Sequence, residues 1–299
     1  LITLILVCTM SNITNAQNPF YGQYHTPHEA VPFDRIETEH YEPAILEGIK
    51  LQNAEIEAII QNPEKADFTN TIEAFEESGE LLDKVVAVFG NMLSAETNDD
   101  LQELAQKIMP LLSEHSNNIT LNEKLFARVK EVYNQKETLQ LTQEQKQLLE
   151  NAYNSFIRHG ANLEGEAREE YRRLTTELSK LTLTFSENNL KETNAYQMLL
   201  TKKESLAGLP EIIIEAAAET AKNEEKEGWA FTLHAPSYIP FMTYSDNRDL
   251  RQKLYMAYNT KCTHDNEFNN IDIVKKIANT RMKIAQLLGY KDYAEYTLK

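Results

Sequence analysis

Apolar residues recur at helical spacing along most of this chain, and this feature restricts its fold more than any other. In residues 42–61, isoleucines stand at positions 45, 49, 56 and 60, which places one apolar stripe along a helix. Nine glycines and nine prolines in 299 residues are too few for the frequent turns of a sandwich or barrel. The pattern predicts a mostly helical bundle.

Helix start and stop signals support this prediction. Asn70 with Glu73, and Thr142 with Gln145, have the spacing of capping boxes. Gly289 follows the last periodic segment as a helix stop. The periodicity predicts helices at residues 42–61, 70–93, 99–113, 123–134, 142–159, 166–190, 211–223, 246–258 and 271–288.

The composition changes near residue 201, and a strand signal follows. Residues 229–233 are aromatic and β-preferring, and they predict a strand. Residues 239–244 are its predicted hairpin partner, confined to an edge by Pro236 and Pro240. The predicted fold class is therefore all-α, mostly a helical bundle, with one small β-hairpin.

The first sixteen residues resemble a secretory signal. Residues 1–10 are nearly all apolar, and Ala16 closes a small-residue cleavage site. A starting Met and a positive first region are missing, so we expect that the front of the signal is clipped. A lipid anchor on Cys8 and a membrane anchor are the alternatives. Cleavage at Ala16 would leave Cys262 as the remaining cysteine.

Composition excludes several classes of protein. The formal net charge is −16, which argues against a general nucleic-acid binder and against docking on an anionic membrane. Two cysteines rule out a disulfide framework.

Metal-site spacing gives a clear negative result. No His is followed by another His four residues later, so the sequence contains no HExxH. The pair His25 and His28 has Pro27 between its members and indicates an aromatic-rich docking arm rather than a metal site. Three weaker candidates remain. Glu37 and His40 have the spacing of half a di-iron motif. Cys262, His264 and Asp265 could be three zinc ligands, and Cys262 alone could be a catalytic thiol.

Other chemistry is no better supported. There is no G-x-S-x-G elbow, and Gly160 and Gly165 have Walker spacing without the Lys and Ser or Thr that should follow. Paired acidic residues such as 76–77 and 99–100 are typical of solvated helix faces. The aromatic residues at 238, 241, 244, 255 and 258 indicate either core packing or a ligand-binding box. Spacing therefore assigns no catalytic, cofactor-binding or metal-binding residue to this chain.

Nine stretches together carry a resemblance to a known family. In order they are NPF at 18–20, PFDRI at 32–36, EHYEPA at 39–44, FTNTIEAFE at 68–76, ETNAY at 192–196, LAGLP at 206–210, PSY at 236–238, FMTYSDNR at 241–248 and LLGYKDYAEY at 287–296. In this order the chain resembles the N-terminal part of bacterial peptidyl-dipeptidases, in the zinc metallopeptidase family of thimet oligopeptidase and oligopeptidase A.

The resemblance implies a helical fold in two halves around a channel that admits short peptides. It also implies a Zn²⁺ ion held by HExxH and a downstream Glu, with release of dipeptides from the substrate C-terminus. We therefore expect residues 1–16 to be a signal peptide, residues 17–200 a helical N-terminal domain, and residues 201–299 the beginning of a truncated catalytic domain.

Two hypotheses follow from this resemblance. In the first, the chain is the catalytically silent front portion of an exported zinc peptidyl-dipeptidase, and its partners are short peptides and the missing catalytic half. The helix face with Ile277, Ile284 and Leu288 should then stay exposed in this chain and promote aggregation. In the second, the chain is a non-catalytic helical module that binds extended peptides.

Overall fold

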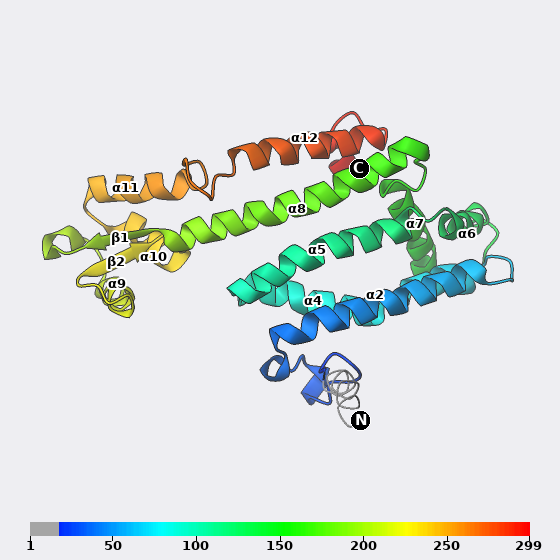
Figure 1. The fold of residues 1–299 in the computed structure, drawn as a ribbon, viewed down its shortest axis with the longest axis horizontal. Coiled ribbons are helices and arrows are strands. Elements are labelled where there is room, and N and C mark those ends of the chain that lie inside the picture. Colours follow the sequence, from blue (N-terminus) through cyan, green and yellow to red (C-terminus); the bar gives the residue numbers. More distant parts are fainter. Residues whose placement is uncertain (1–17) are drawn as a thin grey trace, which may run out of the picture. The chain divides into compact units, whose positions relative to one another are not determined.

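The computed structural model describes residues 18–299, which are mostly helical with one two-stranded antiparallel sheet (Figure 1). The predicted fold class is thus confirmed. The described chain forms two compact units, the first with residues up to Lys180 and from Arg281 onward, the second with residues 181–280. The predicted signal, residues 1–16, lies outside the described residues, and the domain boundary at residue 200 stays a prediction.

The first unit is built from helices of unequal length. In Figure 1, α2, α4 and α5 run side by side. Its elements are α2 (Thr38–Gln61), a π-helical turn (Phe68–Glu73), α3 (Ala74–Glu76), α4 (Glu80–Ala95), α5 (Asp99–Thr120), α6 (Glu123–Asn134), α7 (Gln143–Arg158), the first half of α8 (Gly165–Ala195), the end of α12 (Ile271–Leu287) and α13 (Tyr293–Leu298).

The second unit surrounds the small sheet. It contains the end of α8, β1 (Gln197–Leu200), α9 (Glu211–Asn223), β2 (Trp229–Thr232), α10 (Ala235–Tyr244), α11 (Arg248–Asn259) and the start of α12. No helix of the described residues is long and apolar enough to cross a membrane.

Two helix starts test the predicted caps. The Thr142–Gln145 capping box is present at the start of α7, as predicted. The prediction that Asn70 caps a helix is wrong, because Asp67 is the capping residue. Asn70 stands at the third helical position, and its side-chain oxygen accepts the Asp67 backbone N–H. The helix predicted over residues 70–93 divides at Gly79, whose φ of 86° lies in the left-handed region.

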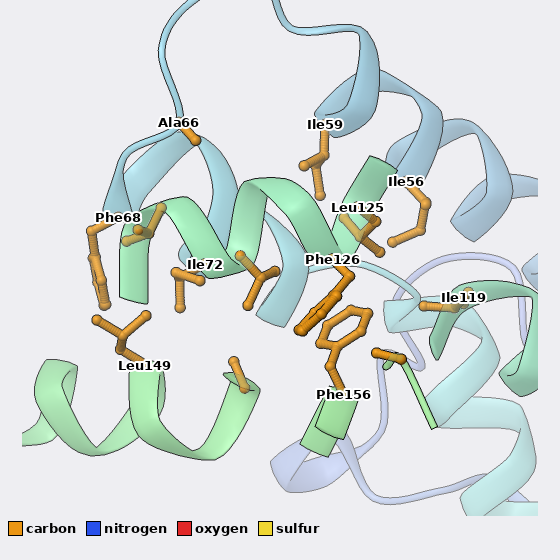
Figure 2. Close-up of a cluster of buried hydrophobic side chains, with 14 residues drawn as sticks. Ile56, Ile59, Ala66, Phe68, Ile72, Ile119, Leu125, Phe126, Leu149 and Phe156 are labelled. Carbon is orange, nitrogen blue, oxygen red and sulfur yellow. The ribbon is translucent and has the colours of Figure 1, made fainter. Parts of the chain in front are cut away.

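The core of the first unit is an aromatic and aliphatic cluster (Figure 2). Phe126 and Phe156 stack with ring centroids 5.7 Å apart, and Phe75 lies 5.3 Å from Phe156. Ile56 from α2 and Leu149 from α7 fill the same cluster. Removal of apolar surface from water is the main force that holds helices of this kind together. It is worth roughly 25 cal/mol per Å² of buried surface, or about 2 kcal/mol for each large side chain.

The Pro-rich segment before α2 docks on the first unit through aromatic rings. Phe20 is fully buried and packs on Tyr41, with centroids 5.4 Å apart, and Tyr41 packs on Phe89 at 5.2 Å. Lys84 donates to the Gly22 carbonyl at 2.7 Å and lies over the Tyr24 ring. The predicted docking arm is therefore present.

The predicted partner of β2 is wrong. Residues 239–244 belong to helix α10, in which Pro236 stands in the first turn, where a missing N–H costs nothing. β2 pairs instead with β1, with Met198 opposite Phe231, and α9 rather than a tight turn connects them. Phe241 of α10 is then free to pack on Phe231, with the two ring centroids 4.6 Å apart.

The helix face predicted to stay exposed is partly buried. Ile284 is 4% exposed and packs with Leu121, Tyr171 and Leu174, and Leu288 packs against the same cluster. The expectation of an open face at Ile284 is therefore wrong, because helices earlier in the chain already cover this residue.

Candidate functional site

A cluster of titratable and polar side chains surrounds Glu192, near the end of α8. Glu192 is a carboxylate that is only 9% exposed. Its Oε1 lies 2.6 Å from Nδ1 of His264, and its Oε2 accepts the backbone N–H of Cys262. The Asn266 amide donates to Oε1 at a longer 3.4 Å. One carboxylate thus binds three residues of the segment between α11 and α12.

The hydrogen bonds determine the ionisation of this cluster. Burial acts to raise the pKa of Glu192, but the bonds from His264, Cys262 and Asn266 outweigh it, so the pKa lies below its usual 4.5. Burial, with Glu192 as an added negative neighbour, raises the pKa of the Cys262 thiol to about 11. The carboxylate is therefore ionised and the thiol protonated at neutral pH, which removes Cys262 as a nucleophile.

A second group of bonds fastens the same segment to α8. Asn270 donates its backbone N–H to the Cys262 carbonyl at 2.8 Å, and its side-chain amide donates to the Phe185 carbonyl at 3.0 Å. The Asn188 amide donates to Oδ1 of Asn270 at 2.9 Å. Phe185, Asn188 and Glu192 can act together because steps of three and four place them on one face of a helix.

A groove of about 340 Å³ lies beside this network. Its apolar wall consists of Phe185, Ile271 and Val274, which are all more than a third exposed. Cys262 and Lys261 from the α11–α12 segment form another part of the lining. The groove therefore has an apolar surface next to a cationic side chain.

The aromatic set predicted from the sequence divides between core and surface. Phe241 is buried, whereas Tyr244 and Tyr255 are half exposed. Tyr238 stacks on Tyr258 with centroids 4.2 Å apart, and Lys261 lies 4.6 Å above the Tyr258 ring. Phe241 is therefore part of the core of the second unit, whereas Tyr244, Tyr255 and Tyr258 lie at its surface.

The metal candidates from the sequence have other roles. His40 accepts the Glu37 backbone N–H at 2.9 Å and completes the cap of α2. His28 lies in a short turn, Pro27–Glu29, with a left-handed φ of 57°. Asp265 is not among the residues that bind Glu192, although Cys262 and His264 are.

Glu192 was missed by reasoning from sequence. A buried carboxylate seven residues after Phe185 carries no motif, and its partners lie about seventy residues later in the chain. The signal available was its place in the ETNAY stretch, which contributes to the family resemblance.

Comparison with known proteins shows similarity to peptidases. Residues 241–299 match the model of peptidase family M3. Over 282 residues the chain is 36% identical to a dipeptidyl carboxypeptidase of Escherichia coli K12, which covers 94% of this chain and 41% of the relative. The chain is related to peptidase family M3. It is also 30% identical to oligopeptidase A of Salmonella typhimurium LT2 over 285 residues, with 94% and 41% covered. The predicted resemblance is therefore confirmed.

The M3 relatives are longer than this chain, which spans about two fifths of their length. The segment that binds Glu192 lies inside the M3-matched residues, and Glu192 lies before them. M3 is a metallopeptidase family, but among residues 18–299 no three His, Cys, Asp or Glu side chains form a group fit for a metal ion. At Glu192 both carboxylate oxygens already accept hydrogen bonds from the α11–α12 segment, so this carboxylate is engaged in holding the backbone rather than presented to a metal ion.

Proposed function

We propose that this chain forms the N-terminal portion of an exported zinc peptidase that removes dipeptides from the C-termini of short peptides. The observation that carries the proposal is the 36% identity to a dipeptidyl carboxypeptidase across 94% of the chain. A second dipeptidyl carboxypeptidase, of Salmonella typhimurium, is 35% identical, whereas oligopeptidase A of the same organism is 30% identical. This difference favours dipeptide release over internal cleavage.

In this proposal the chain supplies the framework and not the reacting groups. A zinc ion with open coordination would polarise the scissile carbonyl, and two His of an HExxH helix would hold it. The 299 residues contain no such motif, so we assign the ligands to sequence that the longer relatives have in addition. The role of this chain is to form part of the walls around the peptide.

Export is the second part of the proposal. It rests on the apolar residues 1–10 and the small-residue site at Ala16. Fractionation of the source cell and N-terminal sequencing of the mature protein test it. A mature N-terminus at Gln17 supports export, and a cytosolic protein that retains residues 1–16 contradicts it.

Zinc binding and hydrolysis test the enzymatic part. The isolated chain should bind no stoichiometric zinc and should not cleave an N-terminally blocked tetrapeptide. Extension through the downstream reading frame should add an HExxH motif and produce zinc-dependent release of the C-terminal dipeptide. Replacement of the motif Glu by Gln is the matched inactive control.

Two results would contradict the proposal. One is hydrolysis by the 299-residue chain itself with one bound zinc. The other is a stop codon directly after Lys299 together with binding of uncleaved peptides, which would instead support the non-catalytic peptide-binding module.

A further inference from the structure

We infer that the segment at residues 260–270, here called the latch loop, is held closed over α8 by the Glu192 carboxylate, and that its release uncovers Cys262 and widens the apolar groove. The inference concerns the second unit alone and does not require the peptidase activity. It rests on how the loop is attached, on what surrounds the carboxylate and on the backbone of Cys262.

The loop is attached through polar bonds that converge on one helix face. Glu192 binds Cys262, His264 and Asn266, and Asn188 with the Phe185 carbonyl binds Asn270. Of the loop's side chains, Cys262 and Asn270 are buried, whereas the residues between them are exposed or half-buried. Apolar packing therefore contributes little between these two points, and hydrogen bonds to α8 determine whether the loop stays closed.

Few charged or titratable groups face the Glu192 carboxylate, so the loop supplies its hydrogen-bond donors. The titratable groups that face it are the His264 ring and the Cys262 thiol. Lys261, which precedes Cys262 in the loop, donates to Thr193 at 2.9 Å and lies over the Tyr258 ring. A buried carboxylate held by hydrogen bonds loses much of its binding when it is neutralised, because hydrogen bonds to a charged group are about twice as strong as neutral ones.

The backbone of the loop favours release once the carboxylate is neutral. Cys262 has a φ of 57°, in the left-handed region that side chains with a Cβ rarely adopt. Such a residue persists where its surroundings hold it in place. Its N–H is bound by Glu192 and its carbonyl by Asn270, so loss of the first bond relaxes the strained residue.

Opening of the loop has a direct consequence for the groove. Lys261, Cys262 and Thr263 of the loop form one part of the lining, and Phe185, Ile271 and Val274 form its apolar part. Movement of the loop away from α8 removes its own part of the lining and leaves the apolar part. Closed and open loops thus present different surfaces for binding.

Hydrogen–deuterium exchange on the full chain tests the inference. Glu192→Gln keeps the size of the side chain, but places an amide donor against the Cys262 N–H or the His264 ring. The rate of deuterium exchange in peptides from residues 260–270 should rise about tenfold to a hundredfold. This is the range expected for the loss of a hydrogen bond to a charged group. Protection of β1 and β2 should not change. Alkylation of Cys262 by N-ethylmaleimide, followed by peptide mapping to separate it from Cys8, should accelerate in parallel.

The matched control is Glu267→Gln, which removes an exposed carboxylate from the same loop. Equal uptake in the Glu192 and Glu267 variants would overturn the inference. If Glu192→Gln instead loses protection throughout residues 181–280, Asn266→Ala decides, because it removes one weak donor. An increase confined to the loop in that variant supports the latch, and no increase refutes it.

Discussion

Ile284 offers the most direct test of how the end of the chain packs. It is 4% exposed and lies among Leu121, Tyr171 and Leu174. Ile284→Ala removes three buried carbon groups, and their burial contributes about 2.4 kcal/mol to stability at roughly 0.8 kcal/mol each. The cavity left behind adds a further cost. We expect a loss of about 3 kcal/mol in the free energy of unfolding. Met282→Ala is the control, since Met282 is on the same helix but 45% exposed, and we expect a loss of about 0.5 kcal/mol or less.

Urea denaturation followed by far-UV circular dichroism measures this loss. With an m-value of about 3 kcal/mol per M, the midpoint should fall by about 1 M. Fluorescence of Trp229, the single tryptophan, reports on the second unit and not on the unit that contains Ile284. Hydrogen exchange of peptides around Leu121 and Leu174 therefore provides the local readout. The reasoning is refuted if Ile284→Ala and Met282→Ala destabilise the chain equally.

Three further predictions concern backbone and ionisation. Gly208→Ala should lower the melting temperature more than Gly165→Ala, because both have positive φ but an added Cβ at Gly208 meets the Tyr244 carbonyl oxygen at 2.3 Å and one at Gly165 meets nothing within 4 Å. Cys262 should titrate near its raised pKa of about 11 in the pH dependence of its alkylation rate, read by peptide mapping, and a midpoint near 9 would contradict the burial argument. Because the folded pKa of Glu192 is lowered, its contribution to stability is complete above pH 4.5 and is lost as the pH falls through the folded value. Acid melts of Glu192→Gln should lack this loss, and identical pH dependence in both proteins would count against it.

Local signals in the sequence were enough to locate most helices. The segment Glu123–Asn134 begins and ends where the pattern predicts, because Asn122 caps it and its apolar residues point to one face. Glu211–Asn223 likewise follows Pro210, whose fixed φ suits a helix start. Both cases need information from neighbouring residues alone.

Pairings between distant segments could not be predicted in the same way. The strand Gln197–Leu200 has four residues and no turn signal that connects it to Trp229–Thr232, so the pattern favours a nearer segment as the partner. Ile284 fits an exposed or a buried helix face equally well until the helices it contacts are known. In each case the decisive partner lies far along the chain, where periodicity gives no information.

The Glu192 cluster is better explained by fixing a loop than by catalysis. A general base needs a free oxygen near a substrate proton, but both oxygens of Glu192 accept hydrogen bonds from the loop. A nucleophilic thiol needs a lowered pKa, but that of Cys262 is raised to about 11. These two facts argue against hydrolytic chemistry at this cluster. They also leave a specific role for this part of the chain, in which one ionised carboxylate controls the position of a loop beside an apolar groove.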